Sequence, residues 1–160
     1  MKNSNSRSFL RLLMLTYGGW DHASSRERGV NYIPLLEAGG QYSVRWIPRA
    51  PVRPQSRRAK ILFPFIKRWL TVKRTLFLLF GNWDAIFIQR LFLSHWLLRW
   101  LSKRGAPIIY DFDDAIYLDV PGQPRNSEQT SRMIHSAQQV IVSSQELVPF
   151  CSACGCTPAV

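Results

Sequence analysis

Short apolar runs alternate with longer helical patterns along most of this chain, and that alternation limits the fold more than any other feature. Five runs have the length and composition of buried strands, and we expect strands over residues 10–16, 42–47, 84–89, 107–112 and 139–142. The intervening segments predict helices over residues 24–38, 65–80, 92–101 and 131–137, and a last helix from Ser143 or Ser144 to about residue 153. Strands and helices in this order form βαβ units with right-handed crossovers. The sequence therefore predicts an α/β, Rossmann-like, doubly wound parallel sheet with helices on both faces.

The size and composition of the chain indicate one globular domain. Its 160 residues suffice for one sizeable core and are too few for two ordinary domains. We expect residues 1–9 to form an N-terminal tail and residues 10–160 to form the domain. The first apolar run is short and is split by Arg11, so it reads as a buried strand rather than a signal peptide. We expect a cytoplasmic protein, with peripheral contact on the inner face of the cell membrane as a further expectation.

The formal net charge of +11 favours anionic partners, which include nucleic acid, anionic lipid headgroups and sugar nucleotides. The sequence contains no recognisable nucleic-acid-binding motif, so we expect no nucleic-acid partner. Its three cysteines, Cys151, Cys154 and Cys156, lack the nearby Cys or His residues that would complete a zinc site. We expect reduced thiols and no bound metal.

The turn after the first strand is the first candidate site. Gly18 and Gly19 let the backbone approach a ligand without an intervening Cβ. Ser24 and Glu27 have the spacing of a capping box, which would fix the start of the next helix. The glycine spacing differs from the dinucleotide fingerprint G-x-G-x-x-G, which disfavours NAD binding. An ordinary tight turn with a helix cap is the alternative interpretation.

The start of the same helix is a candidate phosphate site. Free N–H groups and the helix dipole attract anions to a helix N-terminus. We expect Ser25, Arg26 and Arg28 to bind phosphate there together with the two glycines.

A cluster of carboxylates at the end of the fourth strand is the second candidate site. Asp111, Asp113 and Asp114 lie within four residues, and such clustering costs free energy unless a cation, a hydroxyl or an arginine compensates. The cluster could bind sugar hydroxyls, act as a general base or hold a divalent metal, and one aspartate could instead cap the following turn. We expect Asp111 to point inward toward an arginine such as Arg90, and Asp113 and Asp114 to be the ligand candidates. Because both candidate sites follow parallel strands, we expect them at the same carboxyl edge of the sheet.

The second predicted helix is basic and amphipathic, with Pro64 marking its start. Basic side chains form one stripe, which consists of Lys60, Lys67 and Arg74, with Arg57 and Arg68 beside it. The predicted membrane contact comprises Lys60, Lys67, Arg68 and Arg74. Apolar side chains lie on the opposite side: Phe65, Trp69, Val72, Leu76 and Phe80. We expect the apolar side to cover the sheet, while the basic stripe either faces water or rests on an anionic membrane surface.

Several of these segments, taken in order, resemble a known family. Residues 23–29 and 32–39, residues 84–90, the acidic loop within 107–117 and residues 137–144 are similar to the N-terminal domain of retaining, GT-B fold glycosyltransferases of group 1, with a family 4-like character. Enzymes of this family have two Rossmann-like domains, of which the first mainly binds the acceptor and the second binds the nucleotide sugar.

The resemblance implies an acceptor-binding domain that is truncated before the donor domain and acts in cell-surface glycan or glycolipid synthesis. It implies that Gly18 and Gly19 face the donor diphosphate and the acceptor, and that Arg26 or Arg28 helps to bind phosphate or an acidic acceptor. It places Asp113 and Asp114, as catalytic residues, near the reacting sugar. The implied partners are a glycan or lipid-linked acceptor and a donor domain, in a separate chain or encoded by the following DNA. No metal or other cofactor is implied, because the nucleotide sugar is a substrate, and the chain alone would be inactive.

Two alternatives to a glycosyltransferase domain remain open at the level of the sequence. One is a non-catalytic peripheral membrane module with the same fold. The other is a stand-alone flavodoxin-like or nucleotide-binding protein.

Overall fold

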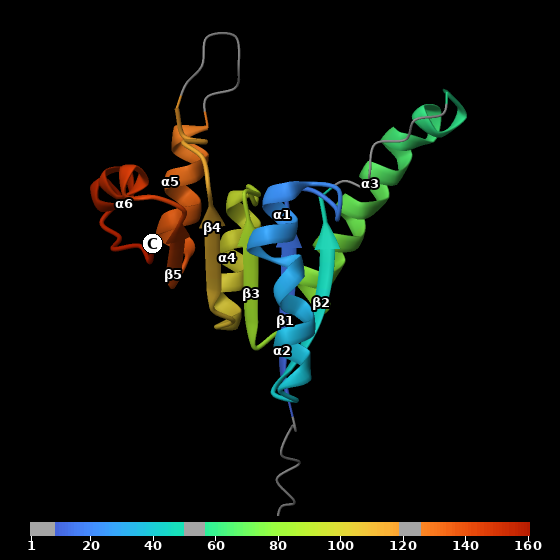
Figure 1. The fold of residues 1–160 in the computed structure, drawn as a ribbon, viewed down its shortest axis with the longest axis horizontal. Coiled ribbons are helices and arrows are strands. Elements are labelled where there is room, and N and C mark those ends of the chain that lie inside the picture. Colours follow the sequence, from blue (N-terminus) through green and yellow to red (C-terminus); the bar gives the residue numbers. More distant parts are fainter. Residues whose placement is uncertain (1–8, 50–56, 119–125) are drawn as a thin grey trace, which may run out of the picture.

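The computed structural model describes residues 9–49, 57–118 and 126–160, and within the helix that begins at Arg57 it describes side chains from Leu62 onward (Figure 1). Within these residues, parallel strands form a single five-stranded sheet in the order β2-β1-β3-β4-β5. The strands are β1 (Leu10–Thr16), β2 (Tyr42–Pro48), β3 (Ala85–Gln89), β4 (Ile108–Phe112) and β5 (Gln139–Val142). The predicted α/β fold class is therefore confirmed. Of the predicted tail, residues 1–8 lie outside the described part of the chain.

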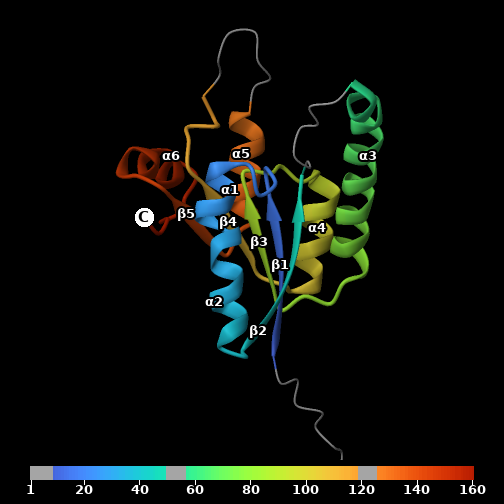
Figure 2. The same cartoon turned by 45° about the vertical axis from the view of Figure 1, so that its right-hand side comes forward.

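The direction of winding reverses next to β1, and this reversal distributes the helices over both faces of the sheet. The chain passes outward from β1 to β2 and then returns across β1 to β3. Right-handed crossovers then place the helices between β1 and β2 on one face, and the later helices on the other (Figure 2). The first group is α1 (Ala23–Arg28) and α2 (Ile33–Ala38); the second is α3 (Arg57–Phe80), α4 (His95–Arg104) and α5 (Ser127–Ser136). In doubly wound folds, the carboxyl edge at such a reversal is where ligands bind.

The strands form the centre of the core because helices cover both faces. Leu13, Leu15, Ile86 and Ile88 are fully buried, as expected for parallel strands with continuous apolar runs. The edge of the sheet at β5 is extended by the C-terminal segment, where Ala159 pairs in parallel with Ile141. In the part of the chain that the structure describes, none of the helices combines the length and the apolar character that a membrane-spanning segment needs.

The helix predicted over residues 24–38 is wrong as a single element. It consists of α1, a 3-10 turn (Val30–Tyr32) and α2. Pro34 lies in the first turn of α2, where its missing N–H costs nothing, whereas inside one long helix it would remove a hydrogen bond. The sequence interpretation overlooked this proline.

The remaining helices differ from the predictions mainly at their ends. α3 begins before Pro64, so this proline lies inside the helix rather than at its start. α4 ends at Gly105, whose φ of 72° gives the left-handed conformation that glycine favours at a helix end. The last predicted helix is a 3-10 turn (Gln145–Leu147) followed by α6 (Val148–Ala153).

The packing predicted for α3 is also wrong. The apolar side chains expected to cover the sheet are exposed: Phe65, Trp69, Val72, Leu76 and Phe80. Leu70 and Leu78, on another side of the helix, are the ones that are buried.

Candidate functional site

The glycine turn and the acidic loop lie in contact at the carboxyl edge of the sheet. Ser24, in the first turn of α1, donates a hydrogen bond from its hydroxyl to Asp113 Oδ2, although 89 residues separate the two in sequence. The prediction that the two sites share one edge is therefore confirmed.

The glycine turn is fixed by hydrogen bonds from buried side chains. The Gly18 N–H donates to Ser25 Oγ over 3.0 Å, and the Thr16 hydroxyl donates to the Gly18 carbonyl over 2.7 Å. A Cβ on Gly18 would lie 2.2 Å from the Cβ of His22, so only glycine fits at this position. Ser25 is fully buried beneath the turn, which makes it a structural support of Gly18.

The predicted capping box is not formed. α1 begins at Ala23, and its N-cap residue, His22, makes no side-chain capping bond. Because the helix starts one residue earlier than expected, Ser24 lies inside the first turn and reaches Asp113 instead. Glu27 pairs with Arg26 at 3.0 Å on the exposed surface.

Asp111 is buried and paired with Arg28, which corrects the expected pairing with Arg90. Asp111 is 1% exposed, and both of its oxygens accept hydrogen bonds from the Arg28 guanidinium. Burial is the largest influence on Asp111 and raises its pKa, although the hydrogen bonds and charge of Arg28 act to lower it. The hydrogen bonds to Asp111 raise the pKa of Arg28. Arg28 thus joins α1 to β4 in the interior of the site.

Arg90 forms ion pairs with the other two carboxylates, Asp113 and Asp114. Its Nη1 lies 3.1 Å from Asp113 Oδ1 and 2.8 Å from Asp114 Oδ2. Among the described residues, Arg90 is the one non-glycine residue whose φ is positive, at 51°. This backbone conformation costs free energy and occurs most often at functional sites. The sequence predicted Arg90 only as a partner for Asp111, although a basic residue directly after a buried strand could also reach the acidic loop that follows Asp111.

Gln89 completes this network from the end of β3. The side chain is fully buried, and its Nε2 donates to the Ser24 carbonyl over 2.8 Å and to Ser24 Oγ over 2.9 Å. Ser24, Gln89, Arg90 and Asp113 therefore hold one another across three strand ends. Such preorganised polar groups keep a fixed geometry when a ligand arrives.

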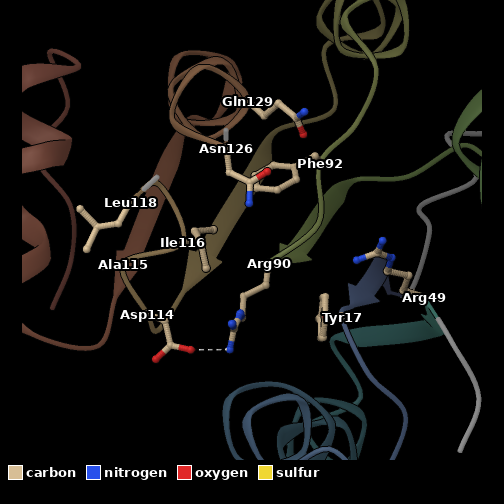
Figure 3. A pocket seen from close by; sticks show the side chains of 10 residues that line it. All are labelled: Tyr17, Arg49, Arg90, Phe92, Asp114, Ala115, Ile116, Leu118, Asn126 and Gln129. Atoms are coloured by element: carbon tan, nitrogen blue, oxygen red, sulfur yellow. Dashed lines mark ion pairs between the residues drawn. The ribbon is translucent and has the colours of Figure 1, made fainter. Parts of the chain in front are cut away.

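A cavity of about 570 Å³ opens beside this network (Figure 3). Its polar lining comes from charged, amide and phenol side chains: Tyr17, Arg49, Arg90, Asp114, Asn126 and Gln129. Its apolar lining comes from Phe92, Ala115, Ile116 and Leu118. Carboxylate and amide groups bind hydroxyls, while guanidinium groups bind anions, so the cavity suits a polyhydroxylated ligand that carries negative charge.

Two arginines meet one aromatic ring in this cavity. The guanidinium carbons of Arg49 and Arg90 lie 5.2 Å and 5.4 Å from the centre of the Tyr17 ring. Figure 3 shows Tyr17 between them, with Arg90 directed toward Asp114 on its other side. Tyr17 and Arg49 could not be selected from the sequence, because their proximity depends on the adjacency of β1 to both β2 and β3.

The predicted site residues divide into two groups. Asp114 lines the cavity, and Asp113 is held next to it by Arg90 and Ser24. The residues predicted to bind phosphate are not among those that line the cavity: Gly18, Gly19, Ser25, Arg26 and Arg28. The glycines instead shape the neighbouring turn, and Arg26 is directed toward Glu27 and the Trp20 carbonyl.

No group of three or more His, Cys, Asp or Glu side chains in the described part of the chain is placed to hold a metal ion. The three cysteines are free, and burial raises the pKa of Cys151 to about 11, so its thiol stays protonated at neutral pH.

Comparison with protein-family models and with curated protein sequences finds no match to this chain.

Proposed function

We propose that this chain is the acceptor-side domain of a nucleotide-sugar-dependent, retaining glycosyltransferase that acts in cell-surface glycan or glycolipid synthesis. The observation that supports the proposal most is the junction of the glycine turn with the acidic loop through Ser24 and Asp113. It lies at the carboxyl edge of a doubly wound sheet, beside the reversal of strand order, where such folds bind ligands. The nucleotide sugar would be bound mainly by a second Rossmann-like domain, and the chain alone would not catalyse transfer.

The cavity suits the acceptor in this proposal. Asp114, Asn126 and Gln129 would bind acceptor hydroxyls, and the apolar wall near Phe92 would contact the face of a sugar ring or a lipid chain. Asp113, which Ser24 and Arg90 hold in place, would lie near the reacting sugar.

The arginines would supply positive charge where the donor diphosphate leaves. Arg49 and Arg90 line the cavity on the side of the glycine turn, and neither needs a metal ion to stabilise phosphate oxygens. We propose no resident cofactor, because the nucleotide sugar is a substrate. The proposed location is the cytoplasm, where nucleotide sugars would be available.

Sugar binding tests the proposal on the chain itself. In saturation-transfer NMR with a panel of methyl glycosides, we expect signals from at least one glycoside and weak or no signals from UDP-glucose. Asp114→Asn removes a charged acceptor of hydrogen bonds, and we expect about a tenfold to hundredfold weaker binding of that glycoside.

The matched control for Asp114→Asn is Asp21→Asn, because Asp21 is exposed and does not line the cavity. The control should bind the glycoside as the unaltered chain does. Tight binding of UDP-glucose with no binding of any glycoside would favour the second candidate, a stand-alone nucleotide-binding protein. That candidate is supported by the two arginines that flank Tyr17.

A further inference from the structure

An apolar stripe runs along the outer side of α3 in the described part of that helix. Its members share high exposure: Leu62, Phe65, Ile66, Trp69, Val72, Leu76 and Phe80. Phe65, Trp69 and Phe80 are 68%, 58% and 78% exposed, so large aromatic surfaces face outward. From Leu62 to Phe80 the stripe extends over roughly 27 Å at a helical rise of about 1.5 Å per residue.

The stripe is not the side of α3 that packs on the sheet. Leu70 and Leu78 are buried, and Phe77 stacks on Trp83 with ring centres 6.0 Å apart. α3 thus has two apolar sides, one of which contributes to the core. A contiguous exposed apolar surface of this length marks an interaction site rather than an ordinary scatter of surface residues.

The neighbouring helix α4 presents further aromatic side chains on the same side of the sheet. α3 and α4 are in contact, and Figure 2 shows them side by side. Trp96 and Trp100 are exposed on α4, and together with Arg99 and Lys103 they line a groove of about 240 Å³. We call the α3 stripe together with these four residues the aromatic-basic face.

The charged side chains that belong to this face are basic: Lys73, Arg99 and Lys103. The sequence contains no acidic residue between Glu37 and Asp84, and α4 contains none. Lys73 interrupts the stripe and lies 4.9 Å from the centre of the Trp69 ring. The field at this face therefore selects for an anionic partner.

The basic residues predicted to meet a membrane are only partly suited to that role. Lys67 and Arg68 are exposed, but the Arg74 side chain is partly buried, and burial lowers its pKa. The side chain of Lys60 lies outside the described part of the chain. Three other basic residues border the exposed aromatic side chains and replace Arg74 as candidates for membrane contact: Lys73, Arg99 and Lys103.

We propose that the aromatic-basic face docks on an anionic lipid bilayer, with α3 lying in the plane of the headgroups. Exposed Trp and Phe side chains beside Lys and Arg are typical of interfacial helices, which insert apolar side chains below the headgroups and keep the charges among the phosphates. A second copy of the chain fits less well, because a symmetric contact would bring the same cations of both copies together.

Vesicle sedimentation with paired variants tests this proposal. We expect the chain to sediment with vesicles of phosphatidylcholine mixed with phosphatidylglycerol, and to sediment much less with phosphatidylcholine alone. Trp69→Ser combined with Val72→Ser should reduce partitioning by at least about tenfold, because it removes apolar surface that would be buried in the bilayer. Lys73→Glu should reduce partitioning by about fivefold or more, since each basic residue near an anionic surface contributes a factor of about that size.

The matched control is Tyr32→Ser combined with Leu35→Ser, an exposed pair with the same spacing on the other side of the sheet. This control should partition as the unaltered chain does, and circular dichroism should give all variants the same melting temperature. Three results would overturn the proposal: no sedimentation with either vesicle, equal sedimentation with both, or an equal loss in the control. Self-association that the Trp69 and Val72 changes abolish would assign the face to a second copy instead. Each of these results leaves the sugar-binding experiment to be judged separately.

Discussion

Replacing Arg28 with alanine is expected to lower the free energy of unfolding by about 3–5 kcal/mol at pH 7, because it leaves the carboxyl group of Asp111 buried without its cation. Asp111 is 1% exposed and lies in β4, so water cannot replace the lost hydrogen bonds without opening the sheet. Denaturation by urea, followed by circular dichroism, would measure the change.

The free energy of unfolding that Arg28→Ala loses should be larger at neutral pH than at acidic pH. In the unaltered chain burial already raises the pKa of Asp111, and Arg28 is the main group that lowers it. In Arg28→Ala the pKa of Asp111 in the folded chain therefore rises further, while in the unfolded chain it stays near the usual value of about 3.9. A raised folded pKa favours folding below the unfolded pKa, and this contribution is lost as the pH rises through the folded pKa. The variant should thus lie closest to the unaltered chain near pH 4 and furthest from it near pH 7.

Arg26→Ala is the matched control, since it changes the same residue type two positions earlier on the same helix. Arg26 pairs with the exposed Glu27, and an exposed pair contributes only about 0–1 kcal/mol. If both substitutions lowered the free energy of unfolding by the same small amount, Arg28 would not be the partner of a buried charge.

Phe112→Ala is expected to lower the free energy of unfolding by about 3–5 kcal/mol, whereas Phe65→Ala on α3 should change it by no more than about 0.5 kcal/mol. Phe112 is fully buried, and its ring centre lies 5.6 Å from that of Tyr110. Phe65 is exposed on the aromatic-basic face. Chemical denaturation of the two variants, which carry the same substitution, compares a core phenylalanine with a surface one.

The stability of Phe65→Ala also shows which side of α3 packs against the domain. A loss of several kcal/mol at Phe65 would mean that the stripe packs against the domain, as the sequence pattern suggested. The aromatic-basic face would then not be available for docking.

The strands were predictable because a parallel sheet that is covered on both faces needs short, continuous apolar runs. Such runs as Leu10–Thr16 and Gln139–Val142 leave little choice of position, and the structure places strands at these bounds. Helix ends were less predictable. Pro34 begins a helix and Pro64 lies within one, and local sequence alone does not distinguish these two positions.

The apolar face of α3 was misassigned because the helix carries apolar side chains on more than one side. Periodicity identifies a stripe but not what lies opposite to it, and the strongest stripe, with Trp69 and Phe80, faces outward. Only the position of α3 over the sheet identifies Leu70 and Leu78 as the packed side chains.

The location of the candidate site followed from the sequence, but its pairings did not. Strand ends in a parallel sheet share an edge, which was sufficient to bring Gly18 and Asp113 together. The choice of arginine depends on strand register, because Gln89 lies opposite Asp111 and Arg90 is therefore one residue further along, level with the acidic loop. Arg90 accordingly meets Asp113 and Asp114, and Asp111 is left to Arg28.

The central claim is that the glycine turn and the acidic loop together form one half of a sugar-transfer site. Amide shift mapping by NMR tests it most directly: a ¹⁵N-labelled chain is titrated with the methyl glycoside that binds in the saturation-transfer experiment. We expect concentration-dependent shifts at Gly18 or Gly19 and, over the same range of glycoside concentration, at Asp113 or Asp114. Shifts confined to residues away from this edge, for example on α2 or β5, would contradict it.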